Sequence, residues 1–475
     1  MEGVCNMYKM PKIVLGVAPT KRGFLSMEEA KRQKDAFMAV IRGIDSDVVD
    51  IVDIDDLCEN GILTADYTNP TKTTQTIQNV IDRFVNAKVD ALFIPHCDFG
   101  EEQCSTAVAA ALKVPTLLWG ARDERPNTFE GRGRDTQCGM FACSKVLRRY
   151  NVPFSYIWNC ETDSDDFKNG YDSFIRVVNV VKTVRSLRIA KFGARPQPFM
   201  SCMDNVGELA TRYGITTVPV SPNAVAKKAD EIAAAGSEEF KAYAADFASR
   251  FESDMPKEKV ERSAAITMAV EQLMEQNNCT VGAMECWTAT PIFGVPVCPT
   301  MGEMADRGYP LSCETDVSGA VTMAILRAVT LNRQSEFLAD LTIRHPENDN
   351  AELLWHCGPF PYSLKNQDSK ARLVGGQESF YLKDGDLTVC RFDEVDGKHY
   401  LFCGEGKTTT GPETTGTYVW LQVDNWKRWE EKLIFGPYIH HVGGTYGNYK
   451  KELREAARYL GMIFDDADEQ GIASL

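Results

Sequence analysis

Two successive series of short apolar strands, alternating with amphipathic helices, restrict the fold of this chain more than any other feature. The first series occupies residues 12 to about 172, with strands expected at Ile13–Val17, Asp47–Ile54, Asp90–Pro95, Val114–Trp119 and Phe154–Trp158. The second series follows a helix expected at Tyr171–Ser186, with strands at Arg188–Phe192, Thr216–Val220 and Thr280–Met284. Such alternation predicts parallel sheets with helices on both faces. We therefore predict two doubly wound α/β domains, residues 1–172 (flavodoxin-like) and 173–345.

The pattern changes after about residue 345, where short alternating runs replace the helical periodicity. These runs are Phe380–Lys383, Leu387–Asp393, His399–Gly404 and Tyr418–Val423. Asp384-Gly385 and Asp396-Gly397 lie between them and are typical of hairpin turns. We predict a C-terminal antiparallel, barrel-like β domain over residues 346–475. It ends in a glycine-rich loop, Gly436–Gly447, and a helix, Tyr449–Leu460.

Composition excludes several classes of function. The chain has 475 residues, a net charge of −15 and no basic tract, which argues against binding to nucleic acid. Its 15 cysteines are scattered without a CxxC pair, and the N-terminus lacks an apolar signal core. Reduced thiols and a cytoplasmic protein are therefore expected. No run of about 18 apolar residues predicts a membrane span, and no GxGxxG or Walker loop follows the first strand.

Leu311–Asp340 carries the most informative acidic residues. A strand (Tyr309–Cys313), a helix capped by Ser318 and a second strand (Glu336–Ile343) are expected there. In a right-handed crossover both strands end at the same edge of one sheet, where α/β proteins bind ligands. Glu314 and Asp340 would then meet. Asp316 would face the opposite side, because side chains alternate on a strand, and would contribute about 1 kcal/mol as a helix cap. A capping acid and a solvated acid are the alternative interpretation.

Histidine and further residues at strand ends complete the candidates. His440 and His441 are adjacent within GPYIHHVGGTYGN, where glycine permits close approach to a ligand. Carboxylates with one imidazole suit Mn²⁺ or Mg²⁺ better than structural zinc, although such pairs are often surface or packing histidines. His96 and Arg122 end strands of the first series, and Glu285 and Trp287 end a strand of the second. Buried, inert cysteine is the commoner interpretation of Cys97, Cys286, Cys313 and Cys357.

The segments CETDVSGAVTM, FLAD, WHCG and HHVGGTYG, in this order, resemble the L-fucose/L-arabinose isomerase superfamily. The resemblance implies that Glu314, Asp340 and His441 bind a metal, with Tyr446-Gly447 in matching register. It also implies a symmetric homo-oligomer in which a neighbour's first domain completes the active site, so that His96 or Arg122 acts in trans. The spacing from Glu314 to Asp340 is two residues longer than in fucose isomerases and the C-terminal domain is shorter, which leaves the sugar open.

The resulting hypothesis is a metal-dependent aldose–ketose isomerase that works through an ene-diolate. Glu314 and Asp340 would share proton transfer and metal binding, with Mn²⁺ as the first expectation and Mg²⁺ or Co²⁺ as alternatives. The substrate contacts would be His356, His440, Trp287, Glu285, His96 and Arg122. The sugar would be a free monosaccharide or one with a phosphate, sulfonate or deoxy group.

Two other functions remain open at this point. One is a sugar-binding or regulatory module without turnover. The other is a cofactor-free racemase that uses Cys97 and Cys286.

Overall fold

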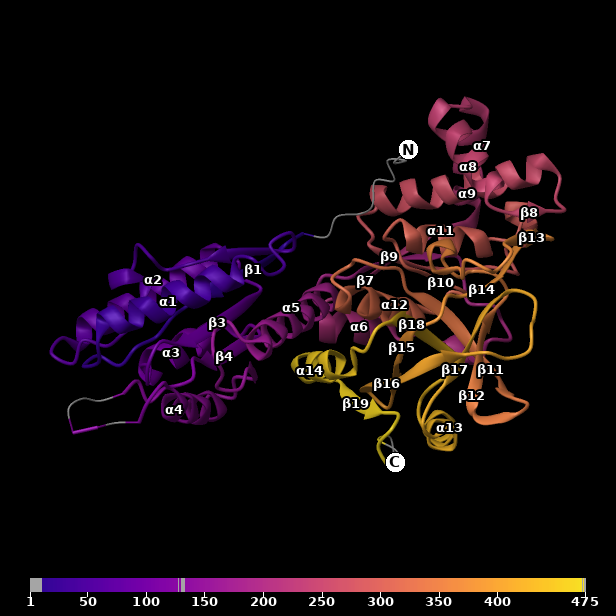
Figure 1. Ribbon diagram of the computed structural model, residues 1–475. Coiled ribbons are helices and arrows are strands. Elements are labelled where there is room, and N and C mark those ends of the chain that lie inside the picture. Colours follow the sequence, from indigo (N-terminus) through magenta and orange to yellow (C-terminus); the bar gives the residue numbers. More distant parts are fainter. Residues whose placement is uncertain (1–10, 127, 130–132, 472, 474–475) are drawn as a thin grey trace. The chain divides into compact units, whose positions relative to one another are not determined.

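The computed structural model describes residues 11–126, 128–129, 133–471 and 473 (Figure 1). The chain divides into two compact units within α5 (Asp165–Arg185). The first unit ends at Asn179 and the second begins at Val180. Each unit is built around its own sheets. In the described part of the chain, no helix has the length and apolar character needed to cross a bilayer.

The first unit contains one parallel sheet. Its strands are β1 (Ile13–Val17), β2 (Val49–Val52), β3 (Ala91–His96), β4 (Thr116–Gly120) and β5 (Phe154–Tyr156). They lie in the order β2-β1-β3-β4-β5, which is the flavodoxin-like order. All four neighbouring pairs are parallel. The predicted strands are therefore confirmed, with ends that differ by a few residues.

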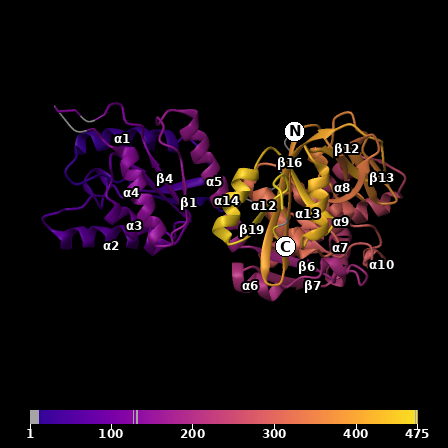
Figure 2. The ribbon, with the colours of Figure 1, turned by 90° about the horizontal axis from the view of Figure 1, so that it is seen from below.

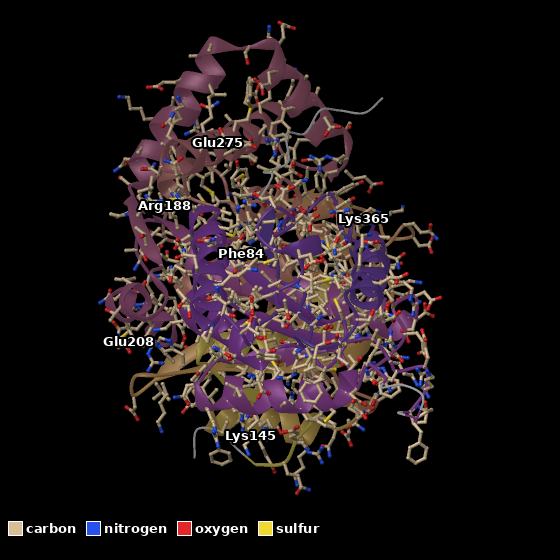
Figure 3. All side chains as sticks on the ribbon, turned by 90° about the vertical axis from the view of Figure 1, so that its left-hand side faces the viewer. Phe84, Lys145, Arg188, Glu208, Glu275 and Lys365 are labelled. Atoms are coloured by element: carbon tan, nitrogen blue, oxygen red, sulfur yellow. The ribbon has the colours of Figure 1, made fainter. Side chains whose placement is uncertain are left out.

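Helices cover both faces of this sheet (Figure 2). They are α1 (Met27–Ile41), α2 (Pro70–Asn86), α3 (Glu102–Leu112), α4 (Thr136–Arg149) and α5. On one face α2, α3 and α4 enclose a core that contains Phe84, a fully buried residue labelled in Figure 3. On the other face the rings of Phe37, from α1, and Trp119 pack edge to face at 6.0 Å. The sequence pattern did not predict α4.

The second unit begins with another parallel sheet. Its strands β6 (Arg188–Phe192), β7 (Thr216–Val220), β9 (Val281–Met284) and β10 (Leu311–Ser312) lie in the order β10-β9-β6-β7. The associated helices are α6 (Val206–Tyr213), α7 (Pro222–Ala235), α8 (Glu238–Ser249), α9 (Lys257–Gln276), α10 (Thr290–Phe293), α11 (Cys298–Asp306) and α12 (Val317–Val329). Every residue of α12 is buried. This helix therefore has no solvent face.

A closed antiparallel barrel forms the rest of this unit. Its strands are β11 (Phe337–His345), β12 (Asn348–His356), β15 (Asp386–Val395), β16 (Lys398–Thr409), β17 (Thr417–Gln422) and β18 (His441–Tyr446). The chain of pairings β16-β15-β18-β11-β12-β17 closes because β16 also pairs with β17. Closure satisfies the edges that an open sheet would expose. The prediction of an antiparallel, barrel-like C-terminal region is confirmed.

Further strands and two helices extend the barrel. The strands β8 (Glu252–Ser253), β13 (Arg372–Val374), β14 (Gln377–Tyr381) and β19 (Ile463–Asp466) join its sheet, partly through parallel pairings. The helices are α13 (Trp426–Phe435), which the sequence pattern did not predict, and α14 (Lys450–Leu460). Asp396-Gly397 connects β15 and β16 as a hairpin. Asp384-Gly385 does not form the predicted hairpin, because β14 pairs with β13 and β17 instead of β15.

Two predictions for the segments that carry Asp340 and His441 were wrong. The strand after α12 does not return to the parallel sheet, because β11 pairs with β12 and β18 in the barrel. The expected loop Gly436–Gly447 contains strand β18, whose glycines admit α12 at close range. A Cβ atom on Gly443 would lie 2.6 Å from Leu326 of that helix. The domain boundaries at residues 172 and 345 remain predictions.

Candidate metal and active site

The turn between β10 and α12 positions the first acidic group. Glu314 and Thr315 have φ angles of 58° and 56°, in the left-handed region. Such conformations cost of order 1–3 kcal/mol each and cluster at functional sites. Hydrogen bonds from the Thr315 backbone N–H to Met284 (3.1 Å) and from its hydroxyl to the Ala194 carbonyl (3.1 Å) hold the turn. The chain is not extended here, so the alternation of a strand does not decide where Glu314 and Asp316 point.

Three barrel strands deliver the other groups. Asp340 on β11 lies directly opposite His441 on β18 and opposite Trp355 on β12 in the strand register. Directly paired residues on neighbouring strands hold their Cβ atoms within about 5.5 Å. His356 is the last residue of β12. The barrel thus brings Asp340, His356 and His441 to one place, although they are far apart in sequence.

Four polar atoms, one each from Glu314, Asp340, His356 and His441, come together in this place. Nε2 of His441 lies 3.1 Å from Oε2 of Glu314 and 3.4 Å from Oδ1 of Asp340. Nε2 of His356 lies 3.9 Å from the same Asp340 oxygen. All four atoms are buried, and none has a hydrogen-bond partner among the described residues. An unpaired buried polar atom costs about 1–3 kcal/mol. Four of them together fit a site that is completed by a bound cation and substrate.

The environment of the His441 ring favours its use as a ligand. Its Nδ1 donates a 2.8 Å hydrogen bond to Oδ2 of Asp316, and a carboxylate can only accept. In the neutral ring, Nε2 then carries the lone pair, facing Glu314 and Asp340. A carboxylate behind a ligating histidine is the usual arrangement at protein metal sites. The ring is fully buried, so its orientation is fixed.

In its neutral form, the His356 ring has the opposite tautomer. The backbone N–H of Cys357 donates to its Nδ1 at 2.9 Å. The neutral ring therefore carries its proton on Nε2, the atom that faces Asp340. A protonated Nε2 cannot ligate a metal, but it can donate to a substrate oxygen. The two histidines are thus chemically distinct even though both reach the same cluster.

A buried ion-pair network holds Asp316. Arg391 on β15 donates to both Asp316 oxygens, at 2.5 Å and 3.2 Å, and its Nε donates to Asp393 at 3.0 Å. Asp316 is also the N-cap of α12, accepting from the Gly319 N–H at 2.9 Å. Ser318 is therefore not the cap, and Asp316 does not face away from the site. Both predictions were wrong because the left-handed turn reorients the chain.

The electrostatics of the cluster favour positive charge at its centre. Burial opposes protonation of His441, but the carboxylates of Asp316 and Glu314 and the nearby Cys202 thiol raise the pKa of its imidazole well above the ordinary value. Burial also opposes ionisation of Glu314, and His441 outweighs it, so the pKa of this carboxyl is lowered. Two ionised carboxylates beside an imidazole stabilise a proton or a cation. The charge distribution therefore agrees with a divalent cation.

Aromatic side chains lie beside the cluster. The Phe199 ring lies 6.4 Å from His441, nearly parallel to it, and 6.3 Å from Trp287. Trp287 is half exposed, with 49% of its surface accessible. His440 Nε2 is 3.9 Å from the Asp340 oxygen, and its side chain is 42% exposed. These groups form a partly open apolar side that suits one face of a sugar ring.

The remaining predicted contacts are described by their own partners. Both carboxylate oxygens of Glu285 accept hydrogen bonds, from the Ala194 N–H at 2.9 Å and the Thr288 hydroxyl at 2.8 Å. His96 and Arg122 belong to the first unit. His96 is buried with its Nδ1 2.9 Å from the Phe99 carbonyl oxygen, and Arg122 is exposed beside Glu161. Their roles as substrate contacts remain predictions.

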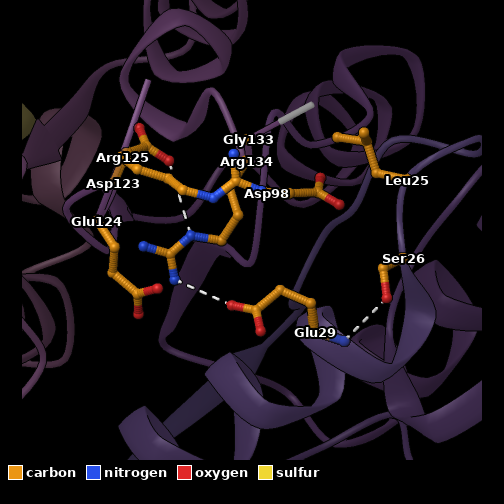
Figure 4. Close-up of a pocket in the computed structure, with 9 residues that line it drawn as sticks. All are labelled: Leu25, Ser26, Glu29, Asp98, Asp123, Glu124, Arg125, Gly133 and Arg134. Carbon is orange, nitrogen blue, oxygen red and sulfur yellow. Dashed lines mark hydrogen bonds and ion pairs between the residues drawn. The ribbon is translucent and has the colours of Figure 1, made fainter. Parts of the chain in front are cut away.

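A polar cavity of about 270 Å³ lies at the sheet edge of the first unit (Figure 4). Asp98, which follows β3, and Asp123, which follows β4, are among its lining residues. Arg134 pairs with Glu29 at 3.3 Å on its wall. The metal-site candidates are not part of it.

The cysteines argue against the racemase alternative. Cys97 is fully buried, and burial raises the pKa of its thiol well above the ordinary value. Such a thiol is a poor proton-transfer group. Cys286 lies instead with Cys313 and Glu314 in a buried group.

Comparison with known proteins adds family information to this geometry. Residues 16–185 match the model for the N-terminal domain of fucose/sulfoquinovose isomerases. Residues 354–467 match the model for the C-terminal domain of L-fucose isomerase. The chain belongs to the fucose isomerase-like superfamily. The resemblance found in the sequence is therefore confirmed. The matched residues cover a larger part of the chain than the four short segments that first showed the resemblance.

Curated relatives in this superfamily are sulfoquinovose isomerases. The one from Alkalicoccus urumqiensis is 25% identical over 80% of this chain and 86% of its own length. The one from Priestia megaterium is 25% identical over 82% of this chain and 88% of its own length. The one from a Clostridium species is 24% identical over 78% of this chain and 84% of its own length. Among solved structures, a periplasmic solute binding protein from Actinobacillus succinogenes with bound D-allose has 14% identity and a TM-score of 0.17, too low to support a structural argument.

Members of the fucose isomerase-like superfamily are generally metal-dependent. Among the described residues, three groups have ligand atoms close enough to share a cation: Asp340 with His440 and His441, Asp316 with Cys202 and His441, and Glu314 with Cys286 and Cys313. The sequence pattern missed Asp316 as a partner of His441, and it missed Arg391 and Phe199 altogether. One signal was present for Arg391. It is a single charged residue within the apolar run LTVCRF, and a buried arginine needs an acidic partner.

Proposed function

We propose that this chain is a metal-dependent aldose–ketose isomerase that acts on an open-chain monosaccharide. The observation that carries the proposal is the convergence of four unpaired buried atoms, from Glu314, Asp340, His356 and His441. The membership in a superfamily of sugar isomerases supports the same reaction. A binding module without turnover would not need two ionisable carboxylates on one imidazole.

Glu314, Asp340 and His441 would hold the cation, with Mn²⁺ as the first choice and Mg²⁺ or Co²⁺ as alternatives. Two carboxylate oxygens and one imidazole nitrogen, with positions left for substrate, are a donor set that suits such ions. When bound, the cation supplies electrostatic stabilisation for the oxygens of an ene-diolate. Asp316 and Arg391 would fix the His441 ring behind it.

Proton transfer between C1 and C2 requires a base that becomes an acid. We assign it to the carboxylates of Glu314 and Asp340, which are the ionisable oxygens in the cluster with unpaired lone pairs. His356 would donate from Nε2 to a substrate hydroxyl or carbonyl oxygen, since its Nδ1 is held by the Cys357 N–H. Trp287, Phe199 and His440 would cover one side of the sugar and restrict water.

The substrate we propose to test first is a sulfonated aldose, because the curated relatives are sulfoquinovose isomerases. We also propose a homo-oligomer in which the first domain of a neighbour supplies His96 or Arg122 to the site.

An NMR screen in D₂O tests the reaction. The purified chain is mixed with Mn²⁺ and, in separate samples, with sulfoquinovose, fucose, arabinose and glucose. The expected result is interconversion with a ketose and deuterium at C1 or C2 in at least one sugar. The parallel sample with excess chelator should show neither. A panel without interconversion or deuterium incorporation, or undiminished activity in the chelated sample, would contradict the proposal.

A further inference from the structure

Two thiols lie in contact beside the candidate site. Sγ of Cys298 and Sγ of Cys357 are 3.4 Å apart. Cys298 is the first residue of α11, and Cys357 directly follows His356 at the end of β12. The two cysteines are 59 positions apart in sequence. The contact therefore joins two separate elements of the second unit.

The spacing is suitable for a disulfide bond. A disulfide has an S–S length of about 2.05 Å, so the two sulfurs must approach by roughly 1.4 Å, shared between two side chains. Rotation about the Cα–Cβ bonds can provide much of this movement. We propose that Cys298 and Cys357 are an oxidation site, which a peroxide converts into a disulfide that disturbs His356.

The chemistry is a two-electron oxidation with hydrogen peroxide as the oxidant. The sulfur of Cys357, the more exposed of the two, attacks one peroxide oxygen. The S–O bond forms, the O–O bond breaks, and the leaving hydroxide takes up a proton to become water. The sulfur of Cys298 then attacks the sulfenic acid. The S–S bond forms, the S–O bond breaks and a second water leaves, so that one peroxide is reduced to two waters.

The link to the site is the backbone of Cys357. Its N–H donates to Nδ1 of His356 at 2.9 Å, and its sulfur lies 3.3 Å from the same nitrogen. Movement of Cys357 toward α11 therefore pulls on the group that sets the tautomer of His356. A displacement of about 1 Å at a reacting site can cost roughly 10²-fold in rate. The oxidised protein should lose activity by about 10- to 100-fold.

A second pair of cysteines in the same unit offers an alternative disulfide against which the inference can be tested. Cys286 and Cys313 also lie close together, in a buried group with Glu314. The geometry favours Cys298–Cys357 because Cys357 is only partly buried, whereas Cys286, Cys298 and Cys313 are buried. Peroxide should reach Cys357 first. The identity of the linked pair therefore tests the inference directly.

Peptide mapping of the full-length protein provides the test. The reduced chain is freed of reductant, treated with hydrogen peroxide, blocked with an alkylating reagent and digested without reduction. The expected product is a peptide pair joined through Cys298 and Cys357, which dithiothreitol releases. A Cys286–Cys313 link, or oxidised cysteines without a Cys298–Cys357 link, would overturn the proposal. This readout does not depend on turnover.

The effect on catalysis rests on the proposed function and is measured separately. Wild-type isomerase activity should fall 10- to 100-fold with peroxide and return with dithiothreitol. Cys298→Ser and Cys357→Ser should each keep most of their own starting activity under the same treatment. Cys279→Ser is the matched control, since the Cys279 thiol bonds to the Asn277 carbonyl. It should be as sensitive as the wild type.

The outcomes separate the two proposals. A mapped Cys298–Cys357 disulfide with no change in turnover would show that the bond does not act on His356. If peroxide lowered the activity of the Cys298→Ser variant as much as that of the wild type, the conclusion would also be that the disulfide does not act on His356. A chain without isomerase activity on any sugar would contradict the proposed function, while the mapping result would still decide whether the disulfide forms.

Discussion

Replacing Asp316 by asparagine tests whether the buried network behind His441 supports metal binding. The Asp316→Asn side chain keeps an oxygen for the N-cap of α12 but loses the charge that pairs with Arg391, whose side chain is 1% exposed. Removing one partner of a buried ion pair costs about 3–5 kcal/mol. Asp393 still contacts Arg391, at 2.9 Å, so we expect a loss of unfolding free energy at the lower end, about 3 kcal/mol.

The same substitution should weaken metal binding. An asparagine amide can present its NH₂ group to Nδ1 of His441, which would move the ring proton to Nε2, the proposed ligand atom. Loss of the carboxylate behind a ligating histidine typically costs 10- to 100-fold in metal affinity, and the wrong tautomer places this variant near the upper end, about 100-fold. Urea denaturation measures the stability, and calorimetric titration with Mn²⁺ measures the affinity.

Asp393→Asn is the matched control. Asp393 is also buried and bonds to Nε of Arg391 at 3.0 Å, so its amide should destabilise the fold by a similar amount. Asp393 has no contact with the His441 ring among the described interactions, and its amide should change the Mn²⁺ affinity less than about threefold. Equal weakening by the two amides would show that the effect is general destabilisation. Wild-type affinity in Asp316→Asn would refute the role of the network.

Three further predictions concern the groups around the cluster. Glu314→Gln and Asp340→Asn should each lower turnover by about 10²–10⁴-fold, with folding checked by circular dichroism; wild-type turnover in either variant would remove that residue from proton transfer. His356→Gln should lower turnover by about 10²-fold while the bound metal, measured by atomic emission, stays near the wild-type content; loss of metal would instead identify His356 as a ligand. Light scattering should give several times the monomer mass, and an active monomer would contradict the proposed oligomer.

Local sequence pattern predicted most strands of this fold but missed helices such as α4 and α13, and it did not predict which strands pair. A strand was expected over Glu336–Ile343, and β11 forms at Phe337–His345. Its neighbours were wrongly predicted, because the pattern of one strand does not specify which sheet it joins. The short connection after α12 is compatible with either a crossover or entry into a barrel. Only the pairing of β11 with β18 distinguishes them.

Backbone conformation explains why the expectation for Asp316 was wrong. The expectation for Asp316 assumed an extended chain, yet residues two apart on a strand share a face, so alternation alone did not support it. The chain in fact has two successive left-handed residues, Glu314 and Thr315. Neither is glycine, the type that normally marks such a turn, so the sequence carried no signal for it. The turn places Glu314 on Nε2 of His441 and Asp316 on Nδ1. One imidazole therefore contacts both acids, which the acid–turn–acid segment places on its two nitrogens.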